Sequence, residues 1–168
     1  MSPARRAWTG IALLILASVL LGLVAGRLLR PAATTEIVRL QADPSCDLRA
    51  GPCELAVPGG GRIRFAITPR DIPVGRELKL SVDLEALRAD RVVVDIDGVD
   101  MDMGLSPYPL QARGGGHFEG PGGLNFCSRG IMEWEAKVTV RRGSEEIIAP
   151  FRFITEAPDP AVPLNEMG

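Results

Sequence analysis

Histidine and cysteine are scarce in this chain of 168 residues, which has one histidine and three cysteines. Nucleophilic catalysis needs a base beside the nucleophile, and a zinc centre needs several Cys or His ligands at short spacing. No such pattern surrounds His117, so we expect that the protein is not an enzyme. Acidic residues are missing from the first 30 positions, whereas the remainder has 21 acidic and 15 basic residues, a formal charge of −6. That charge argues against a nucleic-acid partner.

Charge is also missing from residues 7–26 (AWTGIALLILASVLLGLVAG). A helix of about 20 residues rises about 30 Å, enough to cross the hydrocarbon core of a bilayer. Arginines flank the segment on both sides, so the charge bias does not set its orientation. A cleaved signal peptide is the alternative, although the small-residue sites that follow match a cleavage site poorly. We expect residues 1–30 to be an uncleaved transmembrane anchor.

The remaining chain divides by composition into a linker with two cysteines (31–53), a β domain (54–156) and a proline-rich, disordered tail (157–168). Within the domain, period-two alternation predicts half-buried strands at 62–67, 77–84, 91–96, 132–140 and 146–155. Pro150 in the last run predicts an edge position or a bulge. Short strands without a convincing helix predict an all-β fold, specifically an immunoglobulin-like β-sandwich with Trp134 in its core.

The cysteines divide into a close pair and a remainder. Cys46 and Cys53 enclose a turn signal in CDLRAGPC, which predicts a disulfide in an oxidising compartment. Cys127 is then left over, and a leftover thiol is a candidate for metal binding, redox chemistry or bonding to a partner. A buried, inert cysteine is the alternative.

The segment 98–106 (GVDMDMGLS) places Met101 and Met103 two positions apart after the predicted strand 91–96. If the chain stays extended, both sulfur atoms project from the face opposite the apolar side chains of the strand. A bulge at Gly98 would shift the alternation by one residue and turn both methionines to the other face. Thioethers that face one way can chelate a soft ion such as Cu(I). A hydrophobic plug at the end of the sandwich is the alternative.

Three further side chains complete the pool of predicted copper ligands: Cys127, Met132 and His117. Met132 begins a predicted strand whose even positions are apolar, so core packing is the competing interpretation. An exposed polar surface is the competing interpretation for His117.

Taken together, these features resemble the FixH/YtkA-like proteins over most of residues 60–155. They are the anchor, the Met-x-Met segment (Met101 to Met103), the glycine-rich turn GGGHFEGPG and the tryptophan strand MEWEAKVTV. The resemblance implies a bacterial inner-membrane protein with a single span and a periplasmic immunoglobulin-like domain. Some members are associated with copper supply and cytochrome oxidase assembly. The CDLRAGPC segment and Cys127 depart from the family's pattern.

Two functional hypotheses follow. In the first, the periplasmic domain binds Cu(I) as an accessory protein, with a respiratory oxidase or a copper-delivery protein as its partner. In the second, the domain is a metal-free scaffold that docks onto a membrane complex through its exposed methionines. A third, weaker hypothesis is thiol exchange between Cys127 and the Cys46–Cys53 pair.

Overall fold

The computed structural model describes residues 15–23, 35–100, 107–124 and 131–156. The chain divides into two compact units, Met1–Thr34 and Thr35–Gly168. In the first unit, residues 15–23 form a short helix with exposed side chains. Among the described residues, no helix has the length and apolarity needed to span a membrane. Most of the predicted anchor lies outside the described residues.

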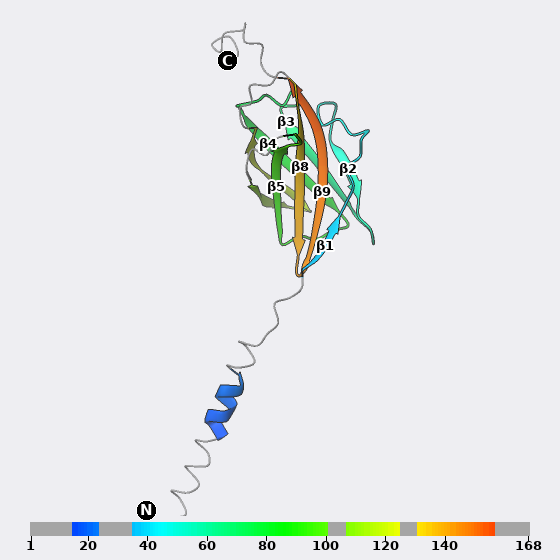
Figure 1. The fold of residues 1–168 in the computed structure, drawn as a ribbon. Helices are drawn as coiled ribbons and strands as arrows, with labels where there is room; N and C mark the ends of the chain where they lie inside the picture. Colours follow the sequence, from blue (N-terminus) through cyan, green and yellow to red (C-terminus); the bar gives the residue numbers. More distant parts are fainter. Residues whose placement is uncertain (1–14, 24–34, 101–106, 125–130, 157–168) are drawn as a thin grey trace, which may run out of the picture. The chain divides into compact units, whose positions relative to one another are not determined.

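The described part of the second unit is a curled sheet (Figure 1). The all-β prediction is therefore confirmed, and the five strands predicted from alternation correspond to β3, β4, β5, β8 and β9. The strands are β1 (Glu36–Arg39), β2 (Cys53–Ala56), β3 (Arg62–Thr68), β4 (Glu77–Glu85), β5 (Arg91–Gly98), β6 (Pro107–Gly114), β7 (His117–Gly123), β8 (Ile131–Arg142) and β9 (Glu145–Glu156).

The strands follow the order β1-β9-β8-β5-β6-β7-β4-β3-β2, and all neighbours are antiparallel except β1 and β9. Strand β6 joins the two halves of the sheet, because its first half pairs with β5 and its second half pairs with β7. The sheet curls so that distant strands meet. The rings of Phe65 in β3 and Phe151 in β9 lie 5.3 Å apart. Figure 1 shows β5, β8 and β9 in front of β3 and β4.

The core lies between these two halves and follows from period-two alternation in each long strand. In β8, for example, every even-numbered residue from Met132 to Val140 is buried, while the odd-numbered residues face outward. Trp134 is almost completely buried, as predicted, and its indole Nε1–H donates a hydrogen bond of 2.8 Å to the hydroxyl of buried Thr155. The largest aromatic side chain of the core therefore has its polar atom satisfied.

The connections between strands separate into two ends of the sheet. At the turn end, short turns join β2 to β3, β6 to β7 and β8 to β9. At the loop end, longer segments join β1 to β2, β3 to β4, β5 to β6 and β7 to β8. Strand β1 starts at the turn end, where the Glu36 N–H donates to the Ser144 carbonyl at 2.9 Å.

Candidate functional site

The described strands that flank the predicted ligands Met101, Met103 and Cys127 meet at the loop end. Met101, Met103 and Cys127 lie outside the described residues, in segments 101–106 and 125–130. The strands that flank these segments are in direct contact. The Val99 N–H, just after β5, donates to the Glu133 carbonyl in β8 at 3.0 Å.

A second contact joins the other two flanking strands. The Tyr108 hydroxyl in β6 donates to the Gly123 carbonyl in β7 at 2.9 Å. The segment with the two methionines runs from β5 to β6, and the segment with Cys127 runs from β7 to β8. The structure therefore brings the starting and ending points of both segments together.

Met132 is described, and it belongs to the core. It is the second residue of β8, its Cα is paired with that of Thr155, and its side chain is only 8% exposed. Its side chain packs with the other buried apolar residues, as the packing interpretation proposed. Copper ligation by Met132 stays a prediction.

His117 lies at the turn end of the sheet, whereas Met132 begins β8 at the loop end. His117 is the first residue of β7, whereas the Cys127 segment follows the last residue of that strand, Gly123. A strand of that length spans about 20 Å at roughly 3.4 Å per residue. Copper ligation by His117 stays a prediction, and the site proposed below does not include it.

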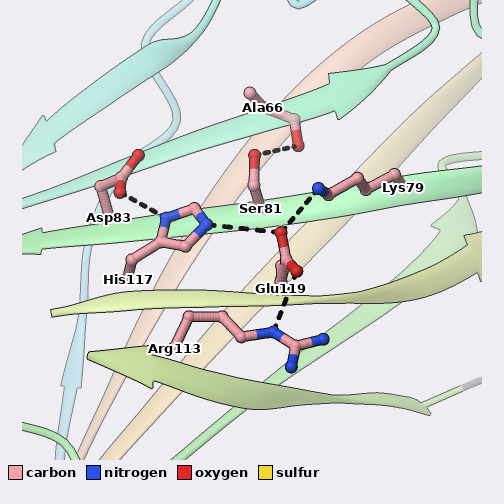
Figure 2. A network of polar contacts seen from close by, with 7 residues as sticks. All are labelled: Ala66, Lys79, Ser81, Asp83, Arg113, His117 and Glu119. Carbon is pink, nitrogen blue, oxygen red and sulfur yellow. Dashed lines mark hydrogen bonds and ion pairs between the residues drawn. The ribbon is translucent and has the colours of Figure 1, made fainter. Parts of the chain in front are cut away.

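Both ring nitrogens of His117 face carboxylates (Figure 2). Nδ1 lies 2.7 Å from Asp83 Oδ1 in β4, and Nε2 lies 3.5 Å from Glu119 Oε2 in β7. The hydrogen bond with Asp83 is the main cause that raises the pKa of His117 above its ordinary value. Both carboxylates thus stabilise the protonated imidazole relative to the neutral form.

Glu119 is the centre of the polar network in Figure 2. Its carboxylate lies 2.6 Å from Lys79 Nζ and 2.9 Å from Arg113 Nε. The hydrogen bond from Lys79 is the main cause that lowers the pKa of Glu119. This arrangement of alternating charges on the outer face of three adjacent strands neutralises itself, and it leaves no exposed cluster of one sign.

The Cα atoms of Cys46 and Cys53 lie 5.7 Å apart, within the range of disulfide-bonded cysteines. The predicted pairing of these two cysteines is therefore confirmed by their distance. Cys53 is buried at the start of β2. Between the two cysteines, Leu48 is inserted into the core with 1% of its surface exposed. The loop that contains the disulfide is thus fixed to the loop end by one bond and one apolar side chain.

Two features of the loop end were not predicted from the sequence. The first is a groove of about 540 Å³ between the disulfide loop and the outer side of β8 and β9. The second is a group of exposed apolar side chains on β8, on β9 and just after β5: Ile131 (70% exposed), Ile154 (52%) and Val99 (38%). Alternation indicated which side chains face outward, but only the pairing of the strands places these three at the same end.

Within the described ranges, no three His, Cys, Asp or Glu side chains are arranged to hold a metal ion. Comparisons with protein-family models, curated proteins and solved structures found no match for this chain. The resemblance to the FixH/YtkA-like proteins thus stays a prediction.

Proposed function

We propose that the curled sheet is an immunoglobulin-like sandwich that presents a soft-metal site at its loop end. The strand order supports the first part of this proposal. The series β3-β4-β7-β6 matches the A-B-E-D sheet of immunoglobulin domains, and β5-β8-β9 matches C-F-G. The chain order of β3 to β9 then equals the order A to G, with β1 and β2 as added edge strands.

The proposed ligands are Met101, Met103 and Cys127, which bind Cu(I) because thioether and thiolate sulfur are soft donors. The contact between Val99 and Glu133 carries this proposal. Met101 is two residues from one partner of that contact, a span of at most about 7 Å. Cys127 is six residues from the other partner, a span of at most about 21 Å. Both segments are therefore long enough for their sulfur atoms to meet.

We propose that residues 1–30 anchor the protein in the bacterial inner membrane and that the domain is periplasmic, an oxidising compartment in which a disulfide persists. In that compartment the proposed site would exchange copper with a respiratory oxidase or a copper-delivery protein.

The test is an anaerobic titration of the full chain with Cu(I) against a competing chelator. We expect the parent to bind one equivalent, and the double variant Met101→Leu/Met103→Leu and the single variant Cys127→Ser to bind at least about tenfold more weakly. The matched control His117→Asn keeps the affinity of the parent. If the double leucine variant competes as well as the parent, the site is not copper-binding.

A second candidate function rests on the exposed side chains Val99, Ile131 and Ile154. An apolar patch that remains exposed in a folded domain marks a contact surface. The domain would then be the metal-free scaffold, and it would dock onto a membrane complex with this patch. Co-purification distinguishes the two, because the variant Ile131→Lys/Ile154→Lys then loses the complex while Met101→Leu/Met103→Leu retains it.

A further inference from the structure

The chain leaves the edge of β9 after Leu40, because Pro150 ends the pairing of β1 with β9. Strand β1 pairs with β9 only from Glu145 to Ile148, and the last bond runs from the Leu40 N–H to the Ile148 carbonyl at 2.9 Å. In this parallel ladder, the next bond would run from the N–H of residue 150 to the Leu40 carbonyl, and proline has no N–H. The predicted edge position of Pro150 is thus confirmed. The chain continues as the disulfide loop, and the groove of about 540 Å³ lies between that loop and β9.

The two cysteines of the disulfide differ in their access from this groove. Cys46 is half-buried, packs against the core and lines the groove. Cys53 is only 6% exposed, and it lies in β2 with its Cα paired with that of Phe65 in β3. A thiolate that reacts with a disulfide must reach one of the two sulfur atoms. Within the described residues, which do not include the predicted disordered tail (157–168), the groove leads to Cys46 and not to Cys53.

The disulfide loop has further attachments that hold it when the S–S bond is broken. Leu48 is inserted into the core with 1% of its surface exposed. The N–H groups of Ala50 and Gly51 donate to the Asp47 carbonyl at 3.0 and 3.1 Å. The strand that follows the loop, β2, is paired with β3 along its whole length. The S–S bond is therefore one constraint among several, and it can open and close in a folded domain.

We propose that the Cys46–Cys53 disulfide is a reversible exchange site for the dithiol of a partner protein, and that Cys46 is the residue attacked. A thiolate of the partner attacks Cys46 Sγ and forms an intermolecular S–S bond. The bond between Cys46 and Cys53 breaks, and its electron pair leaves with Cys53 Sγ. The second thiolate of the partner then attacks the partner's first sulfur atom and releases Cys46 as a thiolate. The partner is oxidised to a disulfide, this chain is reduced, and the two thiol protons of the partner end on Cys53 and Cys46.

The closeness of the two cysteines favours a dithiol over a single thiol as the reductant. After the first step, Cys53 remains beside Cys46, because their Cα atoms lie 5.7 Å apart. The Cys53 thiolate can then attack Cys46 again and expel a single thiol, since an intramolecular attack has a high effective concentration. A second thiol on the partner has the same advantage, so it competes with that reversal and completes the reduction.

The rate of reduction under native conditions tests the proposal in the full chain with Cys127→Ser, which leaves Cys46 and Cys53 as its cysteines. The probe is dithiothreitol, an uncharged dithiol, because charges of both signs line the groove. We expect the rate to rise in proportion to the dithiothreitol concentration, and the tryptophan fluorescence of the folded domain to persist after reduction. A rate that reaches a plateau set by unfolding, or a domain that unfolds on reduction, would overturn the proposal.

Two single-cysteine variants in the same background identify the sulfur atom that is attacked. Cys53→Ala retains the thiol of Cys46, and Cys46→Ala retains the thiol of Cys53. The probe is hydroxyethyl disulfide, which is uncharged and forms a mixed disulfide that mass spectrometry detects. We expect Cys53→Ala to react at least about tenfold faster than Cys46→Ala, because Cys46 lines the groove and Cys53 is buried.

Circular dichroism of both variants checks that they are folded. Equal rates in folded variants, or a faster reaction at Cys53, would show that Cys46 is not the residue attacked. The dithiothreitol experiment needs neither variant, so it decides whether the bond exchanges in the folded domain even if one of them fails to fold.

Discussion

At the scale of single residues, His117 is the clearest electrostatic feature of the structure. Its pKa is raised above 6.5 by Asp83, so the ion pair stabilises the fold below the ordinary pKa of histidine. This contribution is lost as the pH rises through the raised pKa. We expect His117→Asn to destabilise the protein more at pH about 5.5 than at pH about 9.

Urea denaturation at the two pH values measures that difference. In an Asp83→Asn background, the difference between the two pH values should become smaller, because only the contact between His117 and Glu119 remains. An effect of His117→Asn that is equal at both pH values in the parent chain would contradict the ion pair.

Thr155 supplies the second prediction at this scale, because it accepts the hydrogen bond from the buried Trp134 indole. Thr155→Val removes the acceptor and leaves a buried N–H unsatisfied, which costs about 1–3 kcal/mol. Thr139→Val, a half-buried threonine on the outer face of β8, is the matched control and should cost less than about 0.5 kcal/mol. Chemical denaturation followed by tryptophan fluorescence gives both values, and equal costs would exclude the hydrogen bond as the cause.

At the scale of elements, the turn between β6 and β7 depends on Gly116. Its φ is +84°, and a Cβ there would lie 2.5 Å from the Leu84 carbonyl oxygen. Gly115 also has a positive φ, of +63°, but a Cβ at that position would have no heavy atom within 4 Å. Gly115→Ala should cost about 1 kcal/mol from backbone strain alone. Gly116→Ala should cost at least about 1 kcal/mol more, because a backbone atom must move.

Denaturation midpoints of the two alanine variants measure this difference. The structure of the turn is wrong if Gly116→Ala is no more destabilising than Gly115→Ala. Both variants replace a glycine that has a positive φ by alanine, so the difference between them measures the contact with the Leu84 carbonyl.

The strands on either side of this turn, β6 and β7, were not predicted from the sequence, whereas the five longer alternating strands were. Strands β3, β4, β5, β8 and β9 alternate apolar and polar residues over six or more positions, so their period was visible. Strands β6 (PYPLQARG) and β7 (HFEGPGG) contain prolines and glycines, which usually interrupt strands. Here pairing with β4 and β5 holds them in place, and no local pattern carries that information.

At the scale of the whole molecule, the Cys46–Cys53 bond ties the disulfide loop to the sheet. Closing a loop of this length stabilises a fold by about 2.5 kcal/mol in the chain-entropy model. We expect a reductant to lower the denaturation midpoint of the parent, and to leave that of Cys46→Ser/Cys53→Ala unchanged. A parent whose cysteines are shown by alkylation to be reduced, but whose midpoint is the same, would contradict this prediction.

The candidate site was predictable only in part, for a reason of topology. Spacing along the sequence could pair Met101 with Met103, which are two residues apart. It could not reveal that His117 lies at the opposite end of β7 from the Cys127 segment, because this depends on the direction of the strand. Likewise, only the pairing of β5 with β8 shows that the methionine and cysteine segments leave the sheet side by side.

X-ray absorption at the copper edge of the Cu(I)-loaded full chain tests the central claim most directly. His117 is the single histidine of the chain, and it lies at the opposite end of β7 from Gly123, the strand residue nearest in sequence to Cys127. We therefore predict a first shell of sulfur atoms alone, without the outer-shell scattering of an imidazole ring. An imidazole signal, or a copper ion bound only by oxygen and nitrogen, would contradict a thioether and thiolate site at the loop end.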